Sequence, residues 1–479
     1  MLKIDVIVSA TPRGWQQRLI ERLDATGHDV AIGQLAIADT WPASASLALA
    51  LERKLLHRSA ALTAPATIAP RAANRAPDLR LDLTGAAEPN GTPTLQLAFD
   101  GHASDAAMLS NLADGRLPDV ELVLDGKLFE RATPMVDNRI FVAAAVDDVL
   151  TRTITAILRA VSRYDRGERG TTPFLSISSR LPFGMTYLTA ALPRVVREVA
   201  RRGRYHYAHW RVGYRLLDGP GVAETATLGT GWSVLPDDGS RFYADPFAFE
   251  HDGTPYIFVE DYPHATRKAV ISVSTLDASG VAGPPVPVLE EPHHLSYPQV
   301  FAHGGDIWML PEGSGGLKLT LYRAARFPDR WEPAATLLDG EISDATLLEH
   351  DGSFWLFATE RDGGGSTSDT LVVFHAPALT GPWTPHRQNP ILIDRRGARP
   401  GGAVIARDGR LILPVQDGTL GYGGGLGLSA ITHLDRDAVQ LGEPHSVSGM
   451  GDFPYPQIHT LNRAGRLEVI DGIAAVRKR

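Results

Sequence analysis

A fivefold repeat fills the second half of the chain, and this feature limits the possible folds more than any other. In each copy a short alternating run leads through a turn into a second apolar run, as in 245–261 and 344–360. Helical periodicity is absent from this half. Aligning the turns gives spacings of 52, 47, 57 and 54 residues between equivalent positions, which are Asp245, Tyr297, Asp344, Gly401 and Tyr455.

Each copy has room for four strands, two clear and two looser. Four strands in about 50 residues are the pattern of a propeller blade. Five copies therefore predict an all-β five-bladed propeller over residues 206–479. The fifth copy ends soon after its second strand, so its outer strands must come from 209–217 and 232–235, just before the first copy. This closure also avoids exposed sheet edges.

The first half follows a different pattern, in which strand-like and helix-like segments alternate. This alternation predicts an α/β, Rossmann-like domain over 1–165 with a mainly parallel sheet. A connector over 166–205 contains a helix-like segment at 187–202, whose arginines indicate a solvated face or, alternatively, a surface for anionic lipid or phosphate. The expected strands are 4–9, 30–35, 79–83 and 94–99, and the expected helices are 14–26, 46–57 and 146–164.

Composition excludes several classes of protein. The 479 residues include no Cys, which excludes disulfides, thiolate metal sites and a cysteine nucleophile. No apolar stretch of about 18 residues occurs, so we expect no transmembrane helix and no stable membrane insertion, and a cytoplasmic protein is the default. Residues 206–479 hold 22 Lys and Arg against 33 Asp and Glu, a net charge of −11, which argues against a nucleic-acid partner.

Acidic side chains are expected to converge at the centre of the propeller. The first residues of the inner strands point into a shared funnel, and each antiparallel partner strand returns to the same rim. Paired carboxylates are what cleavage of a glycosidic bond needs, and Tyr and Trp offer stacking faces for sugars. The alternative is that these acids only cap turns. The residues expected at the rim from the ends of the partner strands are Glu260, Asp261, Glu312, Glu360, Gln416, Asp417 and Asp471.

Histidines give a weaker signal. His293 and His294 precede the second inner strand and His459 lies in the fifth copy, but they lack close metal-ligand spacing. Ordinary hydrogen-bonded side chains are the favoured interpretation, so we predict no metal and no cofactor. The glycine runs at 363–365 and 423–425 are interpreted as rim loops that could close over a ligand.

Several motifs of the second half together resemble one known family. The resemblance is to the propeller domain named after the N-terminal part of glucosamine inositolphosphorylceramide transferase, which is similar to arabinanase/xylosidase-type glycoside hydrolases. It covers about 206–470. Residues 1–165 more weakly resemble the formyltransferase domain that often precedes this propeller, although that family's Asn-His-Asp set is not visible. The motifs are YADPF, EHDGTPYIFVED, EPHHLSYPQVF, MLPEGSGG, SDATLLEHDGSFWLFATE, LTGPWTPH and ARPGGAVI.

The resemblance implies roles for individual residues. Asp245 matches the catalytic base or nucleophile, and Asp344 matches the Asp that orients the acid. The hydrolases take their acid Glu from the start of blade four, where this chain has Arg399. An Arg cannot act as a general acid at neutral pH, so Glu312 or Glu360 supplies the proton, or the protein is not a hydrolase. An Arg in the funnel suits an anionic ligand.

These inferences define the expected site and function. We expect a carbohydrate-active protein that cleaves or transfers a glycosyl unit, with a carbohydrate or glycolipid head group as partner. The alternatives are a non-catalytic binding module for a glycan or anionic head group, or an enzyme acting through its N-terminal domain. The predicted catalytic residues are Asp245, Asp344 and Glu312. The predicted substrate-binding residues are Glu260, His294, Tyr297, Glu360, Arg399, Gln416, Asp417 and His459.

Overall fold

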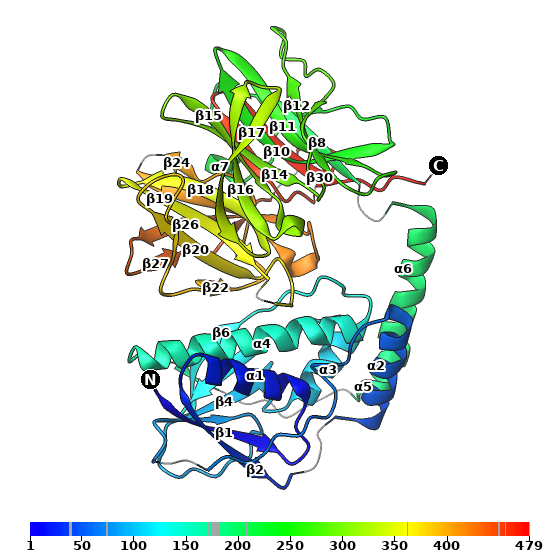
Figure 1. Ribbon diagram of the computed structural model, residues 1–479. Helices are drawn as coiled ribbons and strands as arrows, with labels where there is room; N and C mark the ends of the chain where they lie inside the picture. Colours follow the sequence, from blue (N-terminus) through cyan, green and yellow to red (C-terminus); the bar gives the residue numbers. More distant parts are fainter. Residues whose placement is uncertain are drawn as a thin grey trace. The chain divides into compact units, whose positions relative to one another are not determined.

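The chain folds into two compact units (Figure 1). One comprises residues 1–201 with 363–366, and the other the chain from 202 onward without that segment. Among the described residues, no helix is both long and apolar enough to cross a membrane. The computed structural model describes residues 1–37, 41–72, 75–170, 172–174, 182–206, 209–361, 363–407, 409–448, 451–455 and 457–478.

The first unit contains a seven-stranded mixed sheet in the order β2-β1-β3-β4-β5-β6-β7. The pairings among β1 to β4 are parallel, and those from β4 to β7 are antiparallel. The sheet is therefore mixed: the four strands that were predicted, β1 to β4, form its parallel part, and a Rossmann-like fold stays a prediction. The strands are β1 (Lys3–Ser9), β2 (Asp29–Leu35), β3 (Leu79–Asp82), β4 (Thr94–Phe99), β5 (Val120–Leu124), β6 (Lys127–Ala132) and β7 (Thr172–Pro173).

A tight turn explains the antiparallel pairing of β5 with β6. Asp125 and Gly126 join β5 to β6, and both have positive φ, 49° and 79°. Two such residues form the type I′ turn that reverses the chain directly into a hairpin, so β6 has to run antiparallel to β5.

Helices follow the sequence-predicted segments closely. The longest, α4, is amphipathic and buries most of its residues. Ser104 caps α3 by accepting a hydrogen bond from the Ala106 amide, and Gly115, with φ of 86°, ends it. The helices are α1 (Gly14–Ala25), α2 (Ala43–Leu56), α3 (Asp105–Asp114), α4 (Val142–Asp165), α5 (Phe183–Thr186), the π-helical η1 (Tyr187–Ala191) and α6 (Leu192–Arg204).

The second unit is a propeller of five antiparallel sheets, as predicted. Blade one has β10 (Arg241–His251), β11 (Thr254–Pro263), β12 (Val270–Thr275) and β13 (Val286–Leu289). Blade two has β14 (Ser296–His303), β15 (Asp306–Glu312), β16 (Lys318–Arg326) and β17 (Arg330–Asp339). Blade three has β18 (Ile342–His350), β19 (Ser353–Glu360), β20 (Thr370–Ala376), β21 (Thr384–Pro385) and β22 (Leu392–Ile393). Blade four has β23 (Arg399–Pro400), β24 (Ile405–Arg407), β25 (Arg410–Gln416), β26 (Leu426–Leu434), β27 (Val439–Leu441) and β28 (His445–Ser446).

The fifth blade joins the two ends of the propeller. Its inner strands β29 (Leu461–Ala464) and β30 (Leu467–Ile473) come from the end of the chain, and its outer strands β8 (Trp210–Leu216) and β9 (Ser233–Val234) precede blade one. β30 pairs with β8 over seven residues, from Leu467 opposite Leu216 to Ile473 opposite Trp210. The predicted closure of the ring is confirmed.

The core of the propeller lies between neighbouring blades. Ile257 of blade one packs in one cluster with Val212 and Val469 of blade five, and Leu321 of blade two packs with Leu356 of blade three. Because each blade buries both faces against its neighbours, the inner strand ends are held in fixed positions around the axis. A site built on those ends is therefore rigid.

Backbone strain recurs where the inner strands begin. Asp245, Tyr297 and Asp344 have φ of 47°, 47° and 48°, and each lies at a bulge where the register with the partner strand shifts. A non-glycine residue in this left-handed region costs free energy, which the surrounding structure has to supply. Bulges commonly re-aim a side chain, and here the same device recurs in three successive blades.

Candidate active site

A cavity of about 900 Å³ opens on the propeller; we call it the funnel cavity. Five of the eleven predicted site residues line it, namely Asp245, Glu260, His294, Glu312 and Arg399. The other lining residues are His206, Trp210, Gly239, Ser240, Phe242, Tyr262, His264, Ala265, Arg267, Ser296, Tyr422 and Lys478.

Glu312 ends β15 and carries a carboxyl group that readily holds a proton. Burial and the nearby Asp344 carboxylate raise its pKa to about 7, despite the opposing charge of Arg399. Its Oε1 accepts a hydrogen bond of 2.8 Å from the Ser314 hydroxyl. Its Oε2 accepts one of 3.3 Å from the Asp344 amide. A carboxyl with this pKa exchanges protons at neutral pH, which suits general acid catalysis.

The raised pKa of Glu312 predicts a pH-dependent stability. The folded state favours the protonated form, so the stabilisation is complete below the ordinary pKa of 4.5 and is lost as pH rises through about 7. In Glu312→Gln this loss is absent. The free energy of unfolding of the variant, relative to wild type, should therefore rise by about 3 kcal/mol between pH 4.5 and 8. Urea unfolding at several pH values measures this difference. A difference that does not change with pH would contradict it.

Asp344 lies beneath Arg399 and is almost completely buried. Arg399 donates from Nε to Asp344 Oδ2 at 2.6 Å and from Nη2 to Oδ1 at 3.1 Å, a bidentate ion pair. Gln416 Nε2 donates to the same Oδ2 at 2.6 Å. The carboxylate of Asp344 is thus held by three hydrogen bonds, which fixes its position and leaves little room for contact with a ligand.

Arg399 is itself bonded on every side by the protein. Besides Asp344, its Nη1 donates to the carbonyl and hydroxyl of Thr367 and to the hydroxyl of Ser368, at 3.1–3.3 Å. Its Nη2 lies 3.7 Å from Glu312 Oε2. The positive charge of Arg399 is therefore balanced by the carboxylates of Asp344 and Glu312, and any anion bound in the cavity has to compete with them for this charge.

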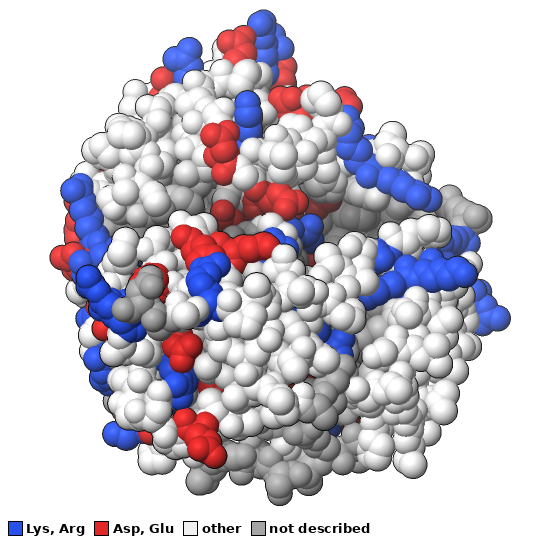
Figure 2. Space-filling model, turned by 60° about the horizontal axis from the view of Figure 1, so that its bottom comes forward, with Lys and Arg blue, Asp and Glu red and all other residues white. Residues whose placement is uncertain are grey.

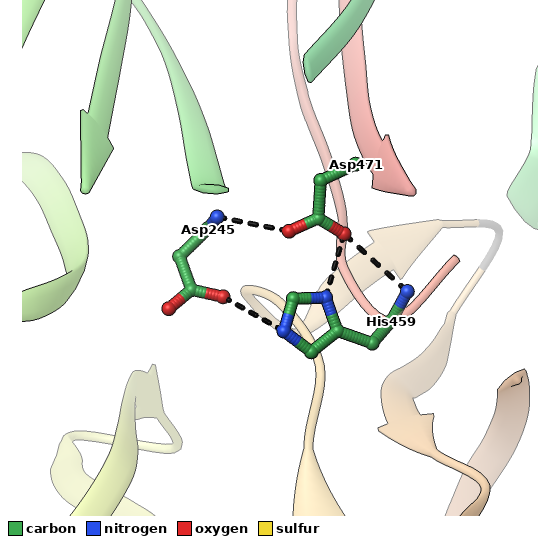
Figure 3. Close-up of side chains that lie close together, drawn as sticks. All are labelled: Asp245, His459 and Asp471. Carbon is green, nitrogen blue, oxygen red and sulfur yellow. Dashed lines mark hydrogen bonds and ion pairs between the residues drawn. The ribbon is translucent and has the colours of Figure 1, made fainter. Parts of the chain in front are cut away.

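Asp245 belongs to a cluster with a histidine and a second aspartate (Figure 3). Its Oδ1 lies 3.4 Å from His459 Nε2, and His459 Nδ1 lies 2.7 Å from Asp471 Oδ1. The Asp245 amide donates to Asp471 Oδ2 at 2.9 Å. Burial, and then the charges of Asp344, Glu260 and Asp471, raise the pKa of Asp245 well above its ordinary value. Asp471 therefore holds the ring of His459 in place beside Asp245.

The same cluster is the metal-ligand group found among the described residues. One ligand atom from each of Asp245, His459 and Asp471 lies within 4.8 Å of the others. However, Asp471 Oδ1 already accepts hydrogen bonds from the His459 ring, the His459 amide and the Thr460 amide. These donors satisfy the carboxylate without a cation, so hydrogen bonding accounts for the arrangement.

Glu260 and His294 form a second polar pair in the cavity. His294 Nε2 lies 3.2 Å from Glu260 Oε1, and its Nδ1 accepts a hydrogen bond of 3.2 Å from the Ala269 amide. Because Nδ1 accepts, Nε2 carries the proton and donates it to Glu260. This pair offers both a hydrogen-bond acceptor and a planar ring to a bound sugar.

Several predicted site residues lie outside the cavity lining. Tyr297 is fully buried at the hub, where its hydroxyl bonds to Thr346 Oγ1 and accepts from the Gly402 amide. Asp417 caps a short 3-10 turn through the Thr419 amide, 2.8 Å away. Glu360 does not occupy the position in blade three that Glu312 occupies in blade two. In blade three Thr359 pairs with Ser343, whereas in blade two Glu312 pairs with Ser296.

The structure also corrects the alignment of the fifth blade. His459 precedes the first paired residue of its inner strand, Leu461, by two positions, as Asp245 precedes Phe247. His459, and not Tyr455, therefore occupies the position equivalent to Asp245. The Gly and Pro residues around Tyr455 hid this offset, because they imitate the turns of the other copies.

Aromatic side chains of the cavity were not predicted individually. Trp210 stacks on His459 with ring centroids 3.9 Å apart, and Phe242 stacks on Tyr262 at 4.7 Å. Tyr422 meets the Trp210 ring edge-on at 6.0 Å. A signal existed for Tyr422, which lies beside the glycine run 423–425 that was interpreted as a rim loop.

The propeller resembles one known family. Residues 233–444 match the model of the family described as glucosamine inositolphosphorylceramide transferase 1, N-terminal. The transferase 1 of Arabidopsis thaliana is 34% identical over 202 residues, 41% of this chain and 26% of its own. That of Oryza sativa subsp. japonica is 32% identical over 253 residues, 49% and 33% respectively. The chain thus spans a third or less of the length of these relatives.

Solved structures of glycoside hydrolases are also similar to this chain. A thermostable family-43 glycoside hydrolase is 11% identical with a TM-score of 0.35, covering 46% of this chain and 84% of its own. An α-L-arabinanase of Cellvibrio cellulosa in complex with arabinohexaose is 18% identical with a TM-score of 0.33, covering 47% and 82%. The names of the curated relatives agree with the prediction of a carbohydrate-active, glycosyltransferase-like protein.

Proposed function

We propose that the funnel cavity binds a sugar and catalyses the cleavage or transfer of its glycosyl unit. The observation that carries this proposal is the presence in one cavity of two carboxyl groups with raised pKa, Asp245 and Glu312. Groups of this kind perform the proton donation and the attack or water activation that glycosidic chemistry requires.

The roles follow from the surroundings of each carboxyl group. Glu312, with a pKa of about 7, donates a proton to the leaving oxygen. In its ionised form, Asp245 stabilises the anomeric centre or, as a base, activates the attacking hydroxyl. Asp344 is a positioning residue, because its amide binds Glu312 and its carboxylate is occupied by Arg399.

The cavity lining supports a sugar with a negatively charged substituent. Tyr262, which is half-buried, offers an aromatic face to a sugar ring. Arg267 and Lys478 also line the cavity and provide positive charge. Phosphate is a suitable ligand for such groups. The relatives' name mentions inositolphosphorylceramide, so we include the head group of such a glycolipid among the candidate substrates.

The test is Asp245→Asn on a panel of aryl glycosides, oligosaccharides and glucosaminyl inositol phosphate. Turnover should fall by at least about 10²-fold, the usual scale of acid–base catalysis, while circular dichroism shows intact folding. Ser279→Ala, in an exposed turn of blade one, is the matched control and should retain full turnover. Unchanged turnover in Asp245→Asn would overturn the proposed role of this residue.

A second candidate function is non-catalytic binding of a glycan or anionic head group. It is favoured by the bonding of Asp344, whose carboxylate is fully engaged with Arg399 and Gln416. Under this alternative, wild type binds members of the panel in calorimetry but converts none of them.

The remaining assignments are proposals about the whole chain. We propose domains at 1–165 and 206–479 with a connector at 166–205, a formyltransferase-like origin for the first, and a cytoplasmic location. An enzymatic role of the N-terminal domain is tested by the same panel, since turnover that survives Asp245→Asn but fails in the isolated propeller would favour it.

A further inference from the structure

The helical segment 183–204 carries an apolar stripe that faces solvent. It runs through α5, η1 and α6, and none of the α6 residues is buried. The exposed fractions of five apolar residues lie between 45% and 67%, with spacings of three and four residues that place them on one helix face. These residues are Met185, Leu188, Leu192, Val196 and Val199.

A second apolar stripe lies on the neighbouring helix α2. Leu47, Leu51 and Leu55 are 56% to 74% exposed and four residues apart. Figure 1 shows α2 beside α5, and the Tyr187 hydroxyl of η1 donates to Glu52 of α2 at 2.8 Å. Two adjoining helices of the same unit thus present leucines, valines and a methionine to water. Apolar surface arranged in this way marks an interaction site.

Basic residues accompany these stripes. The exposed basic residues of the first unit include Arg197 of α6, Lys54 near the end of α2 and Arg58 just after it. Glu198 is the single acidic residue of α6, and it is paired with Arg201 at 2.7 Å. Figure 2 shows Lys and Arg side chains, in blue, at the right-hand edge of the face that it draws.

We propose that α2 and residues 183–201, which belong to the same unit, form a docking surface for an anionic lipid bilayer. A helix with an apolar face and arginines beside it lies in the plane of the interface, with its leucines among the acyl chains and its cations among the phosphates. Charge decides between this occupant and a second copy of the chain. A symmetric dimer would bring the same arginines together, whereas an anionic membrane is complementary to them.

The inference goes beyond the proposed function and does not depend on it, because the surface belongs to helices outside the funnel cavity. It gives that function a physical setting, since a glycolipid head group is presented at a membrane. The experiment therefore uses vesicles that contain no sugar.

Full-length protein is sedimented with sucrose-loaded vesicles of phosphatidylcholine, with or without phosphatidylserine. We expect partitioning onto the phosphatidylserine vesicles to be at least about tenfold higher, and to fall with added salt. Leu188→Asp combined with Val196→Asp should reduce it at least about tenfold, since both side chains are exposed and the fold is retained. Arg197→Glu should reduce it about fivefold or more.

Val281→Asp is the matched control, because Val281 is similarly exposed but lies on the propeller. Val281→Asp and Asp245→Asn should both bind vesicles as wild type does. Loss of catalysis and loss of membrane binding are therefore distinguishable. Absence of vesicle binding by the wild type would overturn the proposal. So would a dimer, seen by analytical ultracentrifugation, that Leu188→Asp with Val196→Asp dissociates without any change in vesicle binding.

Discussion

Replacing Glu312 by Gln is expected to lower turnover by about 10²- to 10⁴-fold, the range of general acid catalysis. Glutamine keeps the shape of the side chain and can bond to the Asp344 amide and the Ser314 hydroxyl, which Glu312 contacts at 3.3 and 2.8 Å. It cannot donate a proton to a leaving oxygen. The loss should therefore appear in kcat, with a smaller effect on KM.

Two comparisons separate this chemical role from a structural one. Aryl glycosides with good leaving groups need less protonation, so Glu312→Gln should lose less turnover on them than on alkyl glycosides. The turnover of wild type should fall as pH rises through about 7, where Glu312 loses its proton, and this fall should be absent in Glu312→Gln. Glu349→Gln, at an exposed position of blade three, should behave as wild type. Equal losses on both leaving groups would indicate that Glu312 is not the acid.

Replacing Arg399 by Met is expected to destabilise the propeller by about 3–5 kcal/mol, which is the usual cost of leaving one charge of a buried ion pair without its partner. Asp344 would then be a buried carboxylate held by Gln416 alone, with Glu312 close by. Equilibrium unfolding in urea measures this loss as a decrease in the free energy of unfolding. The measurement is made at pH 8, where carboxyl groups are ionised in the unfolded chain.

A double variant provides the control for this prediction. Arg399→Met with Asp344→Asn removes both charges, so much of the stability should return. Arg466→Met breaks an exposed ion pair with Asp218 and should change stability little. If Arg399→Met were as stable as wild type, Arg399 would not be needed to balance the charge of Asp344.

The fold of the propeller could be predicted because its signals are local and repeated. Each hairpin has alternating apolar residues and a turn, and an incomplete fifth copy can only be completed by strands from its other end. β8 and β9 fulfil that expectation. In the first half, alternation located the helices, but nothing in it fixed the direction of β5 to β7. The turn at Asp125 and Gly126 sets the direction of β6 relative to β5.

The site was only partly predictable, because register decides which side chains reach the cavity. A bulge in three blades places Asp245, Tyr297 and Asp344 alike, yet the partner strands differ by one residue, so that Thr359 replaces Glu360. A one-residue shift turns a side chain to the opposite face of a strand. The partners of Arg399 likewise come from different blades, and no local pattern reveals them.

A crystal structure of Glu312→Gln with a panel oligosaccharide bound would show whether a sugar is processed between Glu312 and Asp245. We expect a glycosidic oxygen within hydrogen-bond distance of the side-chain amide at position 312, the anomeric carbon facing Asp245, and a sugar ring against Tyr262. A sugar bound elsewhere on the propeller, or one whose glycosidic oxygen faces away from both side chains, would contradict this expectation.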